Sequence, residues 1–110
     1  MAHFDTSGLQ PAADQLIEDG IDVVRLGYCD LIGTDRGRDL LVNRFPRTVS
    51  SGVAFCRSVY GTTPAGDVVD IEGGLSAGLP DILAFPDLAT LRPVPWEKGV
   101  AHCIADLYNP

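Results

Sequence analysis

The sequence predicts an α+β fold in which a small mixed sheet is covered by one helix. Three stretches carry this prediction: an amphipathic run that ends at Gly20, an apolar run at 21–29, and an alternating run at 100–108. Alternation with a period of two is typical of a half-buried strand. We expect the last run to pair with residues 21–28, so that the two form the core of the sheet.

The amphipathic run predicts a helix of about two to three turns that begins at Pro11 and ends at Gly20. Its apolar face is formed by Ala12, Ala13, Leu16 and Ile17. A helix this short is marginal alone, so we expect that face to lie on the sheet. Residues 1–9 are expected to be disordered, with Ser7 as a cap of the helix, and residues 10–110 to make one domain.

The other elements follow from apolar runs and from the turn residues between them. We expect strands at 21–29, 38–42, 53–56 and 81–85, a hairpin turn at 30–37, a helical turn at 47–51, and a closing hairpin of 86–96 with 100–108. Helix, hairpin, short strand and final hairpin make a β-grasp-like layout. Between them, Tyr60–Pro80 is rich in glycine and proline and predicts a long loop, which in a compact domain is usually functional, an interface, or disordered without its partner.

Composition excludes several classes of protein. The chain has 15 acidic and 8 basic residues and a net charge of −7, which disfavours a surface for nucleic acid. No apolar run approaches the ~20 residues that span a bilayer, and the first residues lack the basic and apolar regions of a signal peptide. We therefore expect a cytoplasmic protein.

The cysteines and histidines do not predict a metal site. Cys29, Cys56 and Cys103 are odd in number and lack a C-x-x-C spacing, so reduced thiols are expected. His3 and His102 lie too far apart in sequence to suggest a ligand pair. We expect no metal bound by these residues.

The familiar catalytic motifs are absent as well. There is no P-loop, no H-E-x-x-H and no G-x-S-x-G. Asp67, Asp70 and Glu72 lack the spacing of a calcium loop and are interpreted as a solvated acidic loop. A nucleophilic Cys56 beside Arg57 is disfavoured, because a strand-end thiol with a solvated arginine is the simpler interpretation. Trp96 and Tyr108 are interpreted as core or interface residues.

Three segments follow one another along the chain in a recognisable order. The first is a strand and turn ending in D-x-x-G, at Val23–Gly33. The second has the form P-D-L-S-T-x-x-x-x-P-W, at Pro86–Trp96, with Ala89 in place of serine. The third is G-x-A-x-x-x-x-D-x-Y-x-P, at Gly99–Pro110. In order and spacing, over about residues 10–110, the chain resembles the amino-terminal domain of the glutamine synthetase family.

The resemblance implies a β-grasp domain followed by a larger catalytic domain that these residues do not include. The parent enzyme would use ATP and Mg²⁺ or Mn²⁺ to form γ-glutamyl phosphate, which an amine then attacks. In that family the small domain of one subunit closes the active site of the next in a homo-oligomeric ring. The resemblance therefore implies that its own catalytic domain and neighbouring subunits are the partners of this chain, and that alone it binds no cofactor and has no activity.

One departure from the family concerns the amine. Members typically carry F-D-G-S-S after the short strand, where the aspartate helps to bind ammonium; here the segment is Phe55–Val59 and the aspartate position holds Cys56. A neutral thiol beside a cation should hold NH₄⁺ poorly. We therefore expect Cys56, Arg57 and Ser58 to line the amine site across the subunit interface, and the parent enzyme either to use an organic amine or to have lost the use of ammonium.

Two further positions carry over as positioning or interface residues, Asp81 and Trp96. Two other functions stay open at this point. One is a free-standing β-grasp interaction module without catalysis, since fold alone does not fix function. The other is a catalytically inactive homologue that acts in regulation.

Overall fold

A computed structural model describes residues 4–110 of the chain. Residues 1–3, which belong to the segment expected to be disordered and include His3, lie outside the described residues. The two α-helices are α1 (Leu9–Glu18) and α2 (Phe45–Val49). The strands are β1 (Val23–Cys29), β2 (Asp35–Leu41), β3 (Val53–Cys56), β4 (Asp81–Pro86), β5 (Arg92–Pro93) and β6 (Val100–Tyr108). Three short 3-10 helices are η1 (Arg57–Tyr60), η2 (Leu75–Ala77) and η3 (Leu88–Thr90).

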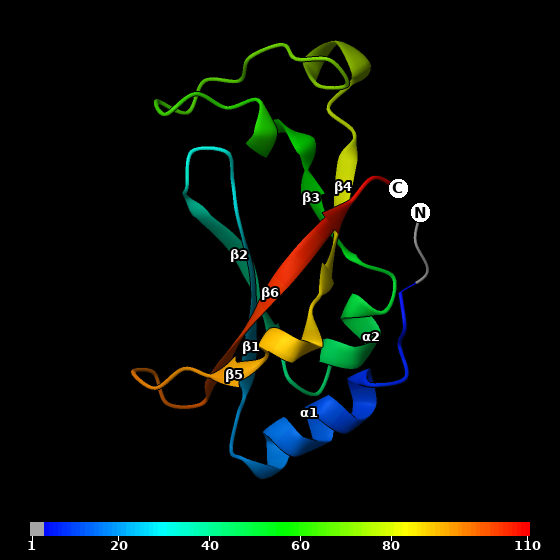
Figure 1. Cartoon of the computed structure of the whole chain (residues 1–110), viewed down its shortest axis with the longest axis vertical. Coiled ribbons are helices and arrows are strands. Elements are labelled where there is room, and N and C mark those ends of the chain that lie inside the picture. Colours follow the sequence, from blue (N-terminus) through cyan, green and yellow to red (C-terminus); the bar gives the residue numbers. More distant parts are fainter. Residues whose placement is uncertain (1–3) are drawn as a thin grey trace.

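The strands form one mixed sheet in the order β2-β1-β6-β4-β3, with β5 paired to β6 (Figure 1). The pairing of β1 with β6 is parallel, and the other pairings are antiparallel. The sheet curls into a half-barrel with one main helix, so the predicted β-grasp-like α+β fold is confirmed. The predicted pairing of the last strand with the first is confirmed too.

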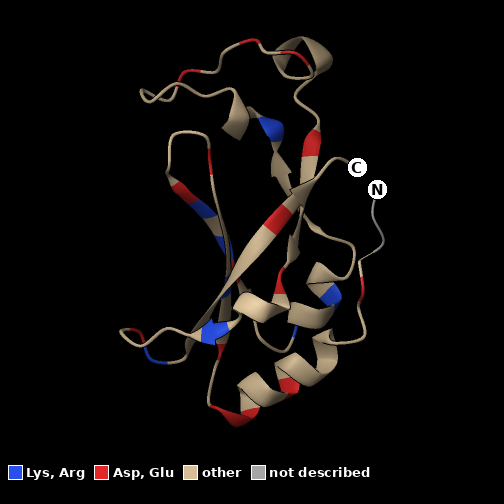
Figure 2. Ribbon diagram, in the orientation of Figure 1, with Lys and Arg blue, Asp and Glu red and all other residues tan. Residues whose placement is uncertain are grey.

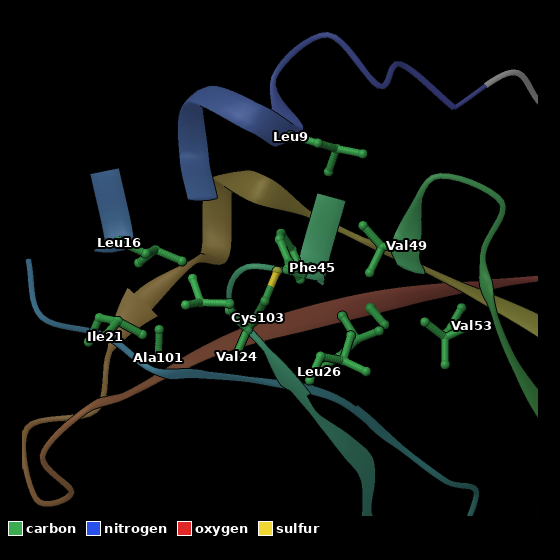
Figure 3. Close-up of a cluster of buried hydrophobic side chains, with 14 residues drawn as sticks. Leu9, Leu16, Ile21, Val24, Leu26, Phe45, Val49, Val53, Ala101 and Cys103 are labelled. Carbon is green, nitrogen blue, oxygen red and sulfur yellow. The ribbon is translucent and has the colours of Figure 1, made fainter. Parts of the chain in front are cut away.

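The core lies between the sheet and the two helices (Figure 3). Strand β6 contributes small side chains at alternate positions, Ala101, Cys103 and Ala105, all buried. Among the larger side chains, Phe45 of α2 and Leu26 of β1 are fully buried. Figure 3 shows the thiol of Cys103 pointing toward Phe45. Small residues on the central strand therefore leave room for the aromatic ring above them.

Helix α1 differs in detail from the sequence prediction. It begins at Leu9, which is buried, while Ile17 of the expected apolar face is 49% exposed. The N-cap is Gly8 and has no side-chain cap, so the prediction of Ser7 as the cap was wrong. The Ser7 N–H instead donates to the Asp5 carboxylate over 2.9 Å. The end of the helix at Gly20 is confirmed, and this glycine has a φ of +81° that favours glycine.

Phe4 lies within the segment expected to be disordered. Its ring packs on Phe85 of β4 with centroids 4.9 Å apart, and Phe85 in turn meets Tyr108 of β6 edge-on at 5.6 Å. This apolar contact was not foreseen, because nothing in the local sequence pattern links residue 4 to a strand some eighty positions later. It connects the start of the described chain to the last strand.

The closing hairpin is shorter than predicted. Of residues 86–96, Pro86 at the end of β4 and Arg92–Pro93 of β5 pair with β6, and the segment between them contains η3. The Asp87 carboxylate accepts a hydrogen bond from the Ala89 N–H over 3.1 Å and so begins the 3-10 turn. Prolines at 93 and 95 lack the N–H that a longer ladder would need.

Strand β2 begins three residues earlier than predicted, at Asp35, because the turn before it is tight. The Asp30 carboxylate accepts hydrogen bonds from the N–H groups of Ile32 and Thr34 over 3.1 and 2.9 Å. Gly33 completes the turn at a φ of +82°. The predicted helical turn at 47–51 is displaced in the same way, to Phe45–Val49.

The buried ring of Phe45 provides a test of the core. Phe45→Ala should lower the free energy of unfolding by about 3–5 kcal/mol, because it removes a large apolar group and leaves a cavity. Leu31→Ala is the control, since Leu31 is 74% exposed, and should change it by less than about 0.5 kcal/mol. Urea unfolding of both variants measures the difference. Equal effects would contradict this description of the core.

Candidate functional site

The residues singled out by the sequence lie mainly at one end of the sheet, where β3 ends and β4 begins. Cys56 and Asp81 are register partners in the antiparallel β3–β4 pair, and both side chains are exposed. A thiol and a carboxylate thus stand side by side on neighbouring strands. The structure brings together two positions that are separated by a long loop in the sequence.

Arg57 and Ser58 continue from Cys56 into η1. The Arg57 guanidinium donates to the carbonyl of Gly73 over 3.3 Å and to the side-chain oxygen of Asn109 over 2.7 Å. The carbonyl of Ser58 accepts hydrogen bonds from the Gly61 N–H and from the Thr62 hydroxyl. Both residues are half-buried. These contacts tie the strand end to the loop that follows it.

The 61–80 loop lies beyond this end of the sheet (Figure 1). It contains η2 and a bridge between Thr62 and Val68, but otherwise it is irregular, as predicted. Figure 2 shows that its charges are acidic, and η1, which begins at Arg57, comes directly before it in the chain. The Asp70 carboxylate accepts two hydrogen bonds from Ser76, which closes the loop on itself.

Trp96 does not join this group. It lies in the connection between β5 and β6, at the opposite end of the sheet from η1 (Figure 1), and it is 84% exposed. Its interpretation as a core residue was therefore wrong, because the turn between the two strands carries it away from the sheet. Its assignment to an interface stays a prediction. Tyr108 packs on Phe85 and is 37% exposed.

Trp96 lies instead at a cleft of about 980 Å³ on the face of the sheet away from the helices. Gly27 lies at the bottom of the cleft and has no side chain to fill it. A Cβ at this position would lie 3.0 Å from His102 Nε2. Ile104 is 50% exposed on the same face. The sequence analysis did not predict this cleft. The alternation of the two strands could have indicated it, because the odd-numbered residues of β1 and the even-numbered residues of β6 share the face of the sheet on which the cleft lies.

A group of ion pairs borders the cleft. Arg25 of β1 donates to both carboxylate oxygens of Asp39 over 2.9 and 3.2 Å, and to Glu97 over 2.9 Å. Its hydrogen bonds with Asp39 and then Glu97 raise the pKa of Arg25. The hydrogen bond from Arg25 likewise lowers the pKa of Asp39. One guanidinium thus faces two carboxylates, so these three side chains together carry a net charge of −1.

A second polar group lies beneath the turn after β1. The Asp30 side chain is 1% exposed and accepts from the Arg36 guanidinium over 3.0 Å. Burial alone would raise the pKa of Asp30, but the hydrogen bonds from Thr34, Arg36 and Ile32 outweigh it, so the pKa is lowered. The buried hydroxyl of Tyr28 has no hydrogen-bond partner among the described residues. Burial raises the pKa of Tyr28 and of Tyr60.

The three thiols differ in what they can do. Burial raises the pKa of Cys103 to about 11, so this group is a neutral core residue and not a nucleophile. Cys29 and Cys56 are exposed. Over residues 4–110, no group of three or more His, Cys, Asp or Glu side chains is arranged to hold a metal ion. Within the same range, no helix is long and apolar enough to cross a bilayer.

Comparison of the sequence with known proteins finds two relatives of which this chain matches a part. It is 33% identical over 99 residues to a glutamate–isopropylamine ligase of a Pseudomonas species, which covers 87% of this chain and 22% of that protein. It is 32% identical over 111 residues to a type-1 glutamine synthetase 2 of Dictyostelium discoideum, covering 94% and 21%. The chain thus spans about a fifth of the length of these relatives. No protein-family model matches it.

Two solved structures are similar to the fold of this chain. A complex of GmaS with ADP superimposes with a TM-score of 0.63 and 25% identity, covering 88% of this chain and 20% of that one. GmaS without ligand superimposes with a TM-score of 0.66 and 24% identity, covering 87% and 20%, and supports the fold alone. Both likenesses are to a fifth of a larger protein.

The buried carboxylate of Asp30 predicts how stability depends on pH. Because folding lowers its pKa, Asp30 stabilises the fold above its unfolded pKa of about 4, and this contribution is lost as the pH falls through the folded value. Asp30→Asn should therefore destabilise the domain at pH 7 and flatten the fall in stability between about pH 5 and pH 2. Asp35→Asn, an exposed carboxylate on β2, is the control.

Unfolding by urea at a series of pH values measures both slopes. An Asp30→Asn variant with the same acid dependence as the parent chain would contradict the stabilising role of this carboxylate.

Proposed function

We propose that this chain, a homologue of the amino-terminal domain of glutamine synthetase-family ligases, supplies one wall of the amine site of an ATP-dependent glutamate–amine ligase. The observation that carries the proposal is the sequence similarity to two such ligases across nearly the whole chain.

The proposed class of amine substrate is inferred from the thiol of Cys56. A carboxylate at that position would attract an ammonium ion and accept its hydrogen bonds, whereas a thiol does neither well. Asp81 on the neighbouring strand is the register partner of Cys56 and is exposed, so it can receive the charged end of a larger amine. We therefore propose an organic amine as the substrate of the full-length protein. One of the relatives is itself a glutamate–isopropylamine ligase.

The rest of the site would come from outside these residues. ATP and a divalent metal ion, which the family implies, activate the glutamate carboxylate when they are bound. The described residues present no metal-binding group, so no step of that activation is assigned to them. We propose that the catalytic groups belong to a second domain, and that the β3–β4 end of this domain closes the site of a neighbouring subunit in a homo-oligomeric ring.

One observation favours a different function. The cleft on the open face of the sheet is bordered by Trp96 and Ile104, both exposed, which is typical of a surface that meets another protein. A free-standing interaction module would use that face and would have no use for the β3–β4 end. A measurement of ligase activity in the full-length protein distinguishes the ligase domain from the interaction module.

The amine preference is tested on the full-length protein. With ATP and glutamate, its kcat/KM for ethanolamine or a polyamine should exceed that for ammonia by at least about tenfold, which is about 1.4 kcal/mol in the transition state. Cys56→Asp should raise kcat/KM for ammonia, because it restores an anion. Ala54→Asp is the matched control, since Ala54 is exposed on the same strand. Efficient glutamine synthesis from ammonia by the unmodified protein would refute the preference.

The 110-residue chain should be inactive by itself. Incubated with ATP, Mg²⁺, glutamate and an amine, it should release no ADP above the background without glutamate, because the groups that bind ATP lie elsewhere. A coupled ADP assay measures this directly. Release of ADP that depends on glutamate would show that the chain carries a catalytic site of its own.

A further inference from the structure

We propose that Arg57 is a positioning residue that holds the 61–80 loop against the end of β6, and that it does not itself contact the amine. Arg57 was expected, by its place beside Cys56, to line the amine site. Its contacts in the structure assign it another task, because its side chain is turned toward the loop and the last residues of the chain.

Three attachments converge on this one residue. One guanidinium nitrogen donates to the Gly73 carbonyl over 3.3 Å, and the other terminal nitrogen donates to the Asn109 side-chain oxygen over 2.7 Å. The Arg57 backbone N–H donates to the Pro80 carbonyl over 3.2 Å. The start of the loop is thereby joined to its middle, to its end and to the strand that lies at the centre of the sheet.

The geometry requires an arginine and a glycine. The planar guanidinium presents several N–H groups at fixed angles and can serve two acceptors at once, which the single ammonium of lysine does poorly. Gly73 has a φ of +73°, and a Cβ at this position would lie 3.2 Å from the Arg57 terminal nitrogen. A glycine therefore leaves the space through which the guanidinium reaches the carbonyl.

Holding the loop matters for the amine site. We call the three hydrogen bonds donated by Arg57 the tether. Without the tether, the segment around Gly73 would be fixed mainly by short-range hydrogen bonds. Examples are the bond from the Gly74 N–H to the Ile71 carbonyl and the bond from the Leu79 N–H to the Gly74 carbonyl, 2.9 and 3.0 Å long. With it, the loop has a defined place beside Cys56 and Asp81. The consequence for the amine rests on the proposed function; the tether itself does not.

The tether is tested on the chain alone by hydrogen exchange of the Gly74 and Leu79 amides. Arg57→Ala should speed their exchange by about threefold to tenfold, since hydrogen bonds to a charged group are lost. Arg57→Lys should restore little of the protection, and Asn109→Asp should slow exchange below that of the unmodified chain, because a carboxylate accepts more strongly. Arg47→Ala on α2 is the control and should change nothing.

Unchanged exchange in Arg57→Ala, or full protection in Arg57→Lys, would overturn the proposal. If Arg57→Ala speeds exchange throughout the sheet, the variant has destabilised the whole domain, and Asn109→Asp then tests the tether because it leaves the arginine in place. Slower exchange of the loop amides in Asn109→Asp supports the tether, and unchanged exchange refutes it. In the full-length enzyme, Arg57→Ala should raise KM for the amine about threefold to tenfold with kcat and the KM for glutamate nearly unchanged. A fall in kcat alone would contradict the positioning role. A full-length protein without ligase activity would refute the proposed function and leave the exchange result standing.

Discussion

The placement of β6 in the middle of the sheet is the constraint on which the other elements depend. This last strand pairs with β1 on one side and with β4 on the other, so neither half of the sheet is complete before the chain reaches residue 100. Its buried positions hold small residues, and the ring of Phe45 occupies the space above them. The domain is thus closed by contacts between residues far apart in sequence.

The same arrangement divides the surface into separate regions. One face of the sheet is taken up by the helices and the core. The opposite face carries the cleft and the Arg25 ion pairs, and the β3–β4 end carries Cys56, Asp81 and the tethered loop. Asp81 and Trp96, the two positions expected to be positioning or interface residues, therefore lie in different regions of the surface. A neighbouring domain that covers both would have to wrap around the edge of the sheet.

Much of the fold could be predicted from the sequence because its elements have local patterns. The alternation of residues 100–108, the apolar run before Cys29 and the glycine at 20 each determine an element from neighbouring residues alone. The errors come from non-local contacts. The hydrogen bonds accepted by Asp30 tighten the turn, so β2 begins earlier than predicted. The hydrogen bond from Arg57 to Asn109 joins residues that are 52 positions apart. No periodicity indicates such a pair, so the resemblance alone suggested the candidate site, and only the structure gives its geometry.

The central claim is that this domain works only as part of an active site shared between subunits. Complementation in the full-length protein tests it most directly. A subunit blocked here by Cys56→Trp and a subunit with an inactivated catalytic domain should each be inactive, and mixed oligomers should recover part of the ligase activity, since some interfaces then combine two intact halves. No recovery in oligomers shown to contain both subunits would contradict the account.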